Sequence, residues 1–311
     1  MLRVRSLWVV LGAGLCLPSL ARADASGWSY LIDRLIADGI SPVQVRQTFD
    51  DPRLPAFDGL EFAPERRHES KNMYRRFLKP ASAAAARRCR QENAAELEAA
   101  ERREGVPANV IAAILYVETG CGRNTGSHRI FYRLARLAMA DEPQNFRQNL
   151  RRVCDEGSSD DLEAKMRARA RYLDETFYPE VRACFEVAHR LGVAPLDLRG
   201  SISGAFGYPQ FLPTSYLRHG VDADHDGRVS LTDPADAAAS CARYLASNGW
   251  QAGMSQKQRR QVIWTYNRSD AYIDTVLTLA ARIDQPVVLA RARKPAASHK
   301  KPPSSPKKRR S

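Results

Sequence analysis

The hydrophobic positions of this chain recur at helical spacing along almost its whole length. Between residues 28 and 36 apolar side chains return every three or four positions, and Gly39 followed by Pro42 ends that helix and starts another. Residues 50–69, rich in proline and charge, indicate a connection, and short strands are expected in the Gly- and aromatic-rich stretch 199–212. The chain is therefore expected to be mainly α-helical, with further helices at 81–103, 105–120, 131–140, 144–155, 160–174, 178–191, 213–219, 234–248 and 270–283.

Two of these predicted helices differ in how far round the helix their apolar side chains extend. Residues 81–103 are rich in Ala, Glu and Arg and have a thin apolar face, which indicates a surface helix. Residues 105–120 are apolar nearly all round, which indicates a buried helix. Pro107 fits the first turn of this buried helix, and Gly120 supplies a left-handed end.

Glu118 is unusual because it is a carboxylate near the end of that apolar helix. Burial and the negative end of the helix dipole both disfavour its charged form, so both raise its pKa. A carboxyl group that keeps its proton near neutral pH can protonate a glycosidic oxygen. The alternative is an ordinary salt bridge, for which Arg123 is a candidate partner.

A second candidate segment, residues 201–216, combines two glycines and two prolines with amide, hydroxyl and aromatic side chains. This combination fits a loop that lines a sugar site, where rings stack on the sugar and polar groups bond to its hydroxyls. Taken alone, the segment is also consistent with an ordinary Gly/Pro turn.

The acidic residues of 222–236 match the spacing of a calcium-binding loop. Such a loop requires acids at positions one, three and five, Gly at six, a carbonyl at seven and an oxygen side chain at nine. The chain supplies Asp222, Asp224, Asp226, Gly227, Arg228 and Ser230 at these positions. Position twelve is Asp233, which could equally cap the next helix because Pro234 follows, and Asp236 could then complete the metal shell. The alternatives are a structural Ca²⁺ site and an acidic surface turn without metal.

The first residues have the form of a secretory signal peptide. Residues 1–23 contain a basic start, an apolar stretch and the small-x-small cleavage site Ala21-Arg22-Ala23. We therefore expect export to the periplasm and a mature chain that begins near Asp24. A lipid anchor at Cys16 is disfavoured because Leu15 stands where such signals have a small residue.

The formal net charge of +13 comes from the two ends. Residues 290–311 contain nine Lys/Arg and the signal three, with no acid in either, which leaves 36 basic against 35 acidic residues in the body. We expect the Pro/Ser/Lys-rich tail to be disordered, and either merely solubilising or tethered to anionic wall polymer or lipid headgroups. The nearly neutral domain, 24–289, is expected to be monomeric and not to bind nucleic acid.

Five cysteines remain after signal cleavage: Cys89, Cys121, Cys154, Cys184 and Cys241. An oxidising periplasm permits disulfides, and the odd number leaves at least one cysteine unpaired or joined to another chain. None has CxxC spacing, which disfavours a zinc or redox-dithiol site.

Four segments, in this order, resemble the membrane-bound lytic murein transglycosylase B family, glycoside hydrolase family 103. Val117-Glu118-Thr119 with 122–126 resembles the catalytic segment, and 201–211 resembles the Ser-x-x-Gly-Ala-Met-Gly-x-x-Gln-Phe motif, with Phe206 in place of Met. Residues 222–245 resemble the calcium loop and its following helix, and Tyr266-Asn267-Arg268-Ser269 with Tyr272 resembles the late Tyr-Asn motif. The likeness runs from about residue 30 to about residue 283.

The resemblance implies a lysozyme-like α+β catalytic core with an additional helical lobe and a calcium-binding loop. It implies that Glu118 is the acid/base and that the glycan is bound by Ser201, Gln210, Tyr244, Tyr266, Asn267 and Tyr272. Cys121 departs from the family pattern beside the catalytic residue. A disulfide there would make the loop rigid, whereas a free thiol would be open to oxidation.

The implied chemistry is cleavage of the MurNAc–GlcNAc β-1,4 bond of peptidoglycan in cell-wall turnover, with 1,6-anhydroMurNAc ends and no catalytic cofactor. Most glycosidases use two carboxylates, but the substrate-like motifs offer no second acid, so Glu118 is expected to act alone. Two alternatives remain, namely a hydrolytic muramidase, which would release reducing ends, and a non-catalytic peptidoglycan-binding protein.

Overall fold

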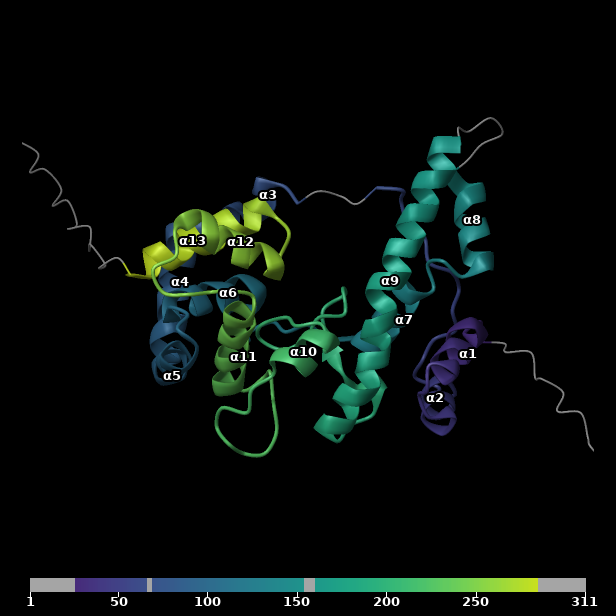
Figure 1. The fold of residues 1–311 in the computed structure, drawn as a ribbon, viewed down its shortest axis with the longest axis horizontal. Coiled ribbons are helices and arrows are strands. Elements are labelled where there is room, and N and C mark those ends of the chain that lie inside the picture. Colours follow the sequence, from purple (N-terminus) through teal and green to yellow (C-terminus); the bar gives the residue numbers. More distant parts are fainter. Residues whose placement is uncertain (1–25, 66–68, 154–159, 285–311) are drawn as a thin grey trace, which may run out of the picture.

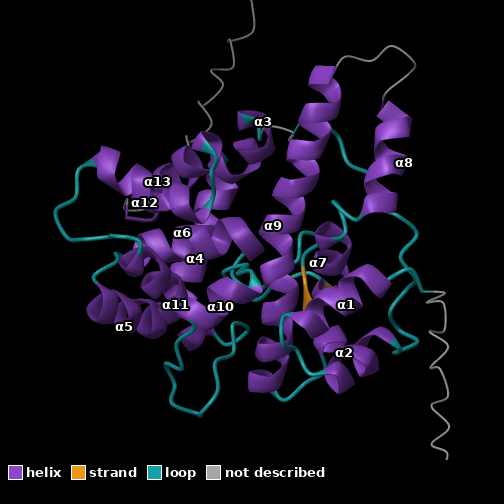
Figure 2. Ribbon diagram, turned by 45° about the vertical axis from the view of Figure 1, so that its right-hand side comes forward, coloured by secondary structure: helices purple, strands orange, loops and turns teal. Residues whose placement is uncertain are grey.

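The computed structural model describes residues 26–65, 69–153 and 160–284, and helices make up most of them (Figures 1 and 2). None of the helices within these ranges has the length and apolar character needed to cross a membrane. The predicted signal peptide, Cys154 and the basic tail lie outside the described residues. The expectation of a mainly α-helical protein is confirmed by α1 (Ser29–Ala37), α2 (Pro42–Phe49), α3 (Lys71–Tyr74), η1 (Arg75–Leu78), α4 (Pro80–Glu92), α5 (Ala94–Glu104), α6 (Ala108–Thr119), β1 (His128–Arg129), α7 (Ile130–Ala138), α8 (Pro143–Val153), α9 (Asp160–Leu191), η2 (Pro195–Asp197), β2 (Arg199–Gly200), α10 (Pro213–His219), α11 (Pro234–Ser247), α12 (Gln256–Tyr266) and α13 (Asp270–Asp284).

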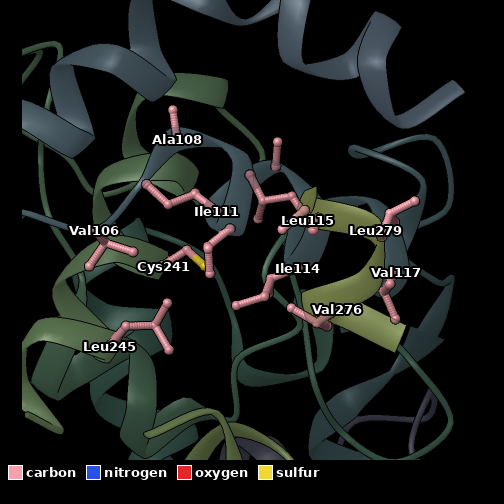
Figure 3. Close-up of a cluster of buried hydrophobic side chains, with 14 of the residues drawn as sticks. Val106, Ala108, Ile111, Ile114, Leu115, Val117, Cys241, Leu245, Val276 and Leu279 are labelled. Atoms are coloured by element: carbon pink, nitrogen blue, oxygen red, sulfur yellow. The ribbon is translucent and has the colours of Figure 1, made fainter. Parts of the chain in front are cut away.

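The helices form two groups, with α10 between them (Figure 1). One group contains α3 to α6 and α11 to α13, and its apolar core surrounds α6. Figure 3 shows Ile111 and Ile114 of α6 among Leu245 of α11 and Val276 and Leu279 of α13. Burial of each of these side chains stabilises the folded state by about 1.5–3 kcal/mol. The prediction that residues 105–120 form a buried helix is therefore confirmed, although Pro107 is the N-cap rather than a first-turn residue.

The other group contains α1, α2 and α7 to α9, and it has a core of its own. This core lies mainly between α7 and the second half of α9, and a smaller cluster lies between α8 and the first half of α9. The active-site candidate Glu118 thus belongs to the first group, while the segment 201–212 leads from the second group toward it.

The prediction of one surface helix at 81–103 is wrong. The segment forms two helices that are separated at Asn93, whose side-chain amide donates to the carbonyl of Cys89 at 2.8 Å. Both helices bury a face, with Ala86 and Leu97 fully enclosed, because α13 packs on α4 and α11 packs on α5. Alanine gives a weak apolar signal in sequence, but its small side chain allows this close helix packing.

Two further helix predictions need correction. Residues 160–191 form one helix with Pro179 in its interior, where two helices were predicted. Proline removes one helical hydrogen bond, and contacts of α9 with α7 and α10 hold the helix together across it. The helix α12 was not predicted because its first six residues are polar, and a capping box of Ser255 and Gln258 starts it.

One strand, β2, and an isolated bridge lie in the stretch 199–212 where short strands were expected, whereas β1 was not predicted. In the antiparallel pair β1–β2, His128 lies opposite Gly200, and an isolated bridge joins Phe206 to Phe211. Gly126 allows the two segments to meet, since a Cβ there would lie 2.2 Å from the carbonyl oxygen of Gly200. The sheet therefore fixes the chain that follows α6 against the start of the segment 201–212.

Candidate active site

Glu118 lies in the last turn of α6, where the chain leaves the apolar core. Gly120 caps the helix with φ 62°, and its N–H donates to the carbonyl of Tyr116 at 2.9 Å. The Tyr272 hydroxyl, from α13, donates to Oε1 of Glu118 at 2.6 Å, and Tyr272 is only 1% exposed. The packing of α13 on α6 therefore fixes the carboxyl group as well as the core.

Burial is the strongest influence on Glu118 and raises its pKa to about 7. The nearby Glu69 carboxylate raises this pKa further, whereas the hydrogen bond from Tyr272 favours the charged form and opposes the rise. Near neutral pH the group can therefore both donate and accept a proton. The salt-bridge alternative is wrong. Arg123 pairs with Glu92 at 3.9 Å, and Glu118 forms no ion pair with any of the residues that the structure describes.

Three tyrosines expected at the site form one cluster beside Glu118. The rings of Tyr266 and Tyr272 are parallel with centroids 6.4 Å apart, and Tyr244 lies edge-on to Tyr266 at 4.9 Å. The Tyr266 hydroxyl donates to the carbonyl of Pro209 at 2.5 Å. Burial raises the pKa of all three tyrosines, so they stay neutral and act as hydrogen-bond donors.

Ser201 and Gln210 shape the segment that faces this cluster. The Ser201 hydroxyl accepts the N–H of Ala205 at 3.2 Å and closes a turn. Gln210 has a left-handed backbone with φ 51°, and its amide donates to the carbonyls of Gly207 at 2.9 Å and Thr125 at 3.2 Å. Each side chain keeps unused capacity, since the serine hydroxyl can donate and the amide oxygen of glutamine can accept.

Two residues near Glu118, Tyr74 and Glu69, belong to none of the four sequence motifs. The Tyr74 ring, from α3, lies edge-on to Tyr272 at 6.0 Å, and its hydroxyl donates to Glu69 at 2.6 Å. The side chain of Asn267, at the C-cap of α12, lies near the Tyr74 hydroxyl and acts to lower its pKa. Glu69 is thus a second carboxylate at the site, although the substrate-like motifs offer none. It lies at the end of the segment 50–69, and no spacing in the sequence relates it to Glu118.

The acid-rich loop between α10 and α11 gathers its carboxylates as its spacing predicted. Oxygen atoms of Asp222, Asp224 and Asp226 lie within 4.8 Å of one another, and so do those of Asp224, Asp233 and Asp236. Asp233 caps α11 by accepting the N–H groups of residues 235 and 236, which was one of the two roles expected for it.

Asp236 and Asp222 show how this loop is held. Asp236 is 1% exposed, and its two carboxylate oxygens accept the N–H groups of Ala223 and Ser230, each at 2.7 Å. Asp222 accepts the N–H of Gly227 at 3.0 Å through Oδ2, while its Oδ1 is buried and has no hydrogen-bond partner. A buried carboxylate oxygen that lacks a donor is the kind of atom that a cation would satisfy.

The cysteines of the described residues fall into two kinds. Cys89 and Cys121 form a disulfide, whereas Cys184 and Cys241 are buried thiols. Of the two states considered for Cys121 beside the catalytic segment, the bonded state is therefore the one found.

A helical fold with one protonatable glutamate at the end of its buried central helix defines a lysozyme-like protein. The chain belongs to the transglycosylase SLT domain family, which matches residues 24–261. The resemblance drawn from the four sequence motifs is thereby confirmed.

A known protein of similar sequence supports this family assignment. The membrane-bound lytic murein transglycosylase B of Escherichia coli (strain K12) is 36% identical over 149 residues, which are 48% of this chain. The match spans 33% of the length of that protein.

Three solved structures share the fold. The soluble lytic transglycosylase SltB1 from Pseudomonas aeruginosa has a TM-score of 0.62 at 24% identity, and the alignment covers 82% of this chain and 97% of that chain. The Escherichia coli lytic transglycosylase Slt35, in complex with calcium, has a TM-score of 0.60 at 21% identity, with coverage of 83% and 92%. SltB3 from Pseudomonas aeruginosa, in complex with NAG-anhNAM-pentapeptide, has a TM-score of 0.58 at 20% identity, with coverage of 82% and 78%.

Proposed function

We propose that the protein is a lytic murein transglycosylase, which cleaves the MurNAc–GlcNAc β-1,4 bond of peptidoglycan and leaves 1,6-anhydroMurNAc ends. The observation that carries this proposal is Glu118, a half-buried carboxyl group whose pKa is raised to about 7 and which accepts a hydrogen bond from the Tyr272 hydroxyl. Membership of the transglycosylase family and the peptidoglycan fragment bound by SltB3 support the same substrate class.

The reaction uses one protein carboxyl group twice. Protonated Glu118 gives its proton to the bridging oxygen as the bond from that oxygen to C1 of MurNAc breaks, and the N-acetyl carbonyl oxygen of the same sugar bonds to C1. The Glu118 carboxylate then takes the proton of the C6 hydroxyl, whose oxygen attacks C1 and displaces the N-acetyl oxygen. Glu118 regains its proton, and no water is consumed. The hydroxyl of Tyr272 stabilises the carboxylate between the two steps.

The remaining predicted site residues would bind the glycan. The rings of Tyr244 and Tyr266, which are partly exposed, would offer faces for sugars, and polar groups of Ser201, Gln210 and Asn267 would offer hydrogen bonds to hydroxyl and acetamido groups. Tyr272 was predicted to line the glycan groove too, but its ring is only 1% exposed, so it would act through its hydroxyl on Glu118. Tyr74 extends this set, because its ring lies edge-on to Tyr272 and its hydroxyl lies near Asn267.

A hydrolytic muramidase is the second candidate function, and Glu69 is the observation that favours it. Hydrolysis needs a second carboxylate that attacks C1 or activates water. Glu69, however, accepts the Tyr74 hydroxyl at 2.6 Å, and burial raises the pKa of that hydroxyl, so Tyr74 stays a neutral donor. This hydrogen bond occupies the Glu69 carboxyl group, which favours its role in raising the pKa of Glu118 over a role in removing a proton from water.

The products of peptidoglycan digestion test the proposal. Muropeptides with 1,6-anhydro ends are lighter by one water than muropeptides with reducing ends, so mass analysis separates the two reactions. We expect anhydro ends from both the wild type and Glu69→Gln. Chiefly reducing ends from the wild type, lost in Glu69→Gln, would assign the chain to the hydrolytic class.

We also propose that the loop 222–236 holds a structural Ca²⁺. The unpartnered Oδ1 of Asp222 and the oxygens gathered around Asp224 fit a hard cation that prefers oxygen ligands. The ligands would be carboxylates of Asp222, Asp224 and Asp226, the backbone carbonyl of Arg228, and a carboxylate of Asp236 or Asp233. The ion would neutralise the loop and tie it to α11. The calcium complex of Slt35 supports this assignment.

The site of action that we propose is the periplasm, where peptidoglycan lies. The support is the signal-like composition of residues 1–23 and the family's substrate. The nine basic residues of 290–311 would add attraction to anionic wall or membrane surfaces.

A further inference from the structure

We propose that the disulfide between Cys89 and Cys121 positions Glu118 and the adjoining wall of the substrate site for turnover. This proposal rests on the proposed function, because it assigns the bond a role in catalysis. Cys121 directly follows the C-cap Gly120, three positions after Glu118. Cys89 lies in the last turn of α4 and is 2% exposed. The bond thus ties the chain that leaves the catalytic helix to a second helix, across a sequence separation of 32.

The backbone at this point has a conformation that needs support. Gly120, Cys121 and Gly122 have φ values of 62°, 61° and 79°, so three successive residues are left-handed. Residues with a Cβ atom rarely adopt this conformation, and they keep it where surrounding contacts impose it. The N–H of Cys121 donates to the carbonyl of Leu115 at 3.0 Å, and the disulfide holds its side chain. Cys121 is therefore restrained by α6 on one side and by α4 on the other.

The segment that Cys121 restrains supports the other wall of the site. A Cβ on Gly122 would lie 2.0 Å from Cζ of Tyr208, so the tyrosine ring rests directly on the glycine backbone. The Thr119 hydroxyl donates to the carbonyl of Tyr208 at 3.0 Å and accepts the N–H of Gly122 at 2.9 Å. The amide of Gln210 reaches the same segment at Thr125, at 3.2 Å.

The two sides of the site thus meet at one restrained turn. Glu118 precedes the turn, and the segment 201–212 rests on it. If the disulfide is absent, α6 still has the apolar contacts of its own side chains with α11 and α13, but the turn can relax. A displacement of about 1 Å between a catalytic group and its substrate can lower turnover about a hundred-fold. Loss of the bond should therefore lower kcat by about ten- to a hundred-fold and change KM much less.

Two variants distinguish the effect of the disulfide from the effect of the left-handed backbone at residue 121. Cys89→Ser removes the bond and leaves a non-glycine residue in the left-handed conformation. Cys121→Gly removes the bond and also removes the conformational conflict. Cys184→Ala, in the core of the other group of helices, is the matched cysteine control. All proteins are exported under oxidising conditions, and peptide mapping establishes which cysteines are joined.

We expect both variants to lose kcat at temperatures well below their melting transitions, and Cys184→Ala to keep it. Dithiothreitol, whose two thiols become a cyclic disulfide as they reduce the protein bond, should lower the activity of the wild type and leave Cys121→Gly unchanged. The assay is the release of anhydro-muropeptides, with kcat and KM measured separately and folding followed by circular dichroism.

Three results would overturn the positioning role. They are an unlinked Cys89 in the wild type, a lower melting temperature with unchanged kcat in both variants, or full activity in Cys121→Gly with loss in Cys89→Ser. The last result would show that the backbone conformation matters and the bond does not. A wild type that forms no anhydro ends would instead contradict the proposed function, whatever the disulfide does.

Discussion

The proton on Glu118 is controlled by three neighbouring influences. Burial and the charge of Glu69 favour the protonated form, and the hydroxyl of Tyr272 favours the charged form. Their balance places the pKa at about 7 instead of the ordinary 4.5. A residue that must give a proton and then take one back works best when its pKa is near the working pH. The environment of this one side chain therefore matches its two proposed roles.

Glu118→Gln should abolish cleavage while the protein still folds and binds glycan. An amide has the shape of the carboxyl group but cannot transfer its proton, and acid/base assistance is worth about 10²–10⁴-fold in rate. The measurement is the initial rate of anhydro-muropeptide release, together with pull-down on insoluble peptidoglycan. Glu92→Gln, an exposed glutamate on α4, is the control and should keep full activity. Substantial activity in purified Glu118→Gln would contradict the assignment of Glu118 as the acid/base.

The same substitution should change stability in a pH-dependent way. The folded-state pKa of Glu118 lies above its ordinary value, so its stabilising contribution is complete below about pH 4.5 and is lost as the pH rises through about 7. Glutamine has no charge to bury. We therefore expect Glu118→Gln to melt at a higher temperature than the wild type at pH 8, with a smaller difference at pH 5. Equal differences at both pH values would contradict this account of its burial.

The pH dependence of kcat/KM should report Glu118 and its bond to Tyr272. The protonated acid starts the reaction, so the rate should fall as the pH rises through about 7. Tyr272→Phe removes the donor that favours the charged form, which should raise the pKa of Glu118 and move the alkaline limb to higher pH. Tyr172→Phe, on the exposed side of α9, should leave the profile unchanged. A limb that moves to lower pH in Tyr272→Phe would refute the role of this hydrogen bond.

Among the elements, the loop 222–236 carries the most distinctive local signal. Its acids use several of their oxygens to fix the loop backbone, and Asp233 also starts α11. The loop therefore holds much of its shape through its own hydrogen bonds. A cation would add stability mainly by satisfying the remaining carboxylate oxygens and by relieving their mutual repulsion.

Calcium should raise the melting temperature through this loop. Extracellular modules of this kind bind at about 10⁻⁴–10⁻³ M, and ligand at about ten times Kd stabilises the folded state by about 1.4 kcal/mol. We expect several millimolar Ca²⁺ to raise Tm by a few degrees, and Asp224→Ala to abolish the rise. Asp161→Ala, which removes an exposed acid on α9, should keep it. Identical melting curves in calcium and in chelator would reject the site.

The helices show where periodicity is a reliable signal and where it is not. It identified α6 correctly, because the helix is buried on all sides and has a defined end at Gly120. The prediction joined α4 and α5 into one helix, because their buried faces consist largely of alanine, which gives a weak apolar signal. It divided α9 near Pro179, because a proline usually interrupts a helix. In each wrong case, packing between helices outweighed the local preference.

For the whole molecule, the site depends on the contact between distant segments. Glu118 comes from α6, Tyr272 from α13, and Tyr74 from α3, and their side chains meet only because these helices pack around one core. The segment 201–212 reaches this core from the other group of helices (Figure 1). Neither group alone contains every residue of the proposed site.

Deleting residues 285–311 should separate catalysis from surface attachment. The deleted segment carries all nine basic residues of the C-terminal end and no residue of the proposed site. We expect unchanged cleavage of soluble glycan fragments and weaker binding to insoluble peptidoglycan in low salt. The difference in binding should vanish at about 0.5 M salt, because screening removes attraction between exposed charges. Slower cleavage of soluble fragments by the truncated chain would show that this segment contributes to the site.

The sequence by itself identified the candidate residues whose proposed roles depend on a local pattern. Glu118 is recognisable because a carboxylate at the end of an apolar helix is costly, and the loop 222–236 because its ligands lie within a few positions of one another. The tertiary structure alone decided which side chains surround Glu118. Glu69 and Tyr74 lie more than forty positions before it, and Cys89 was not identified as the partner of Cys121. Contacts of this kind arise from helix packing, and residue spacing along a chain does not specify them.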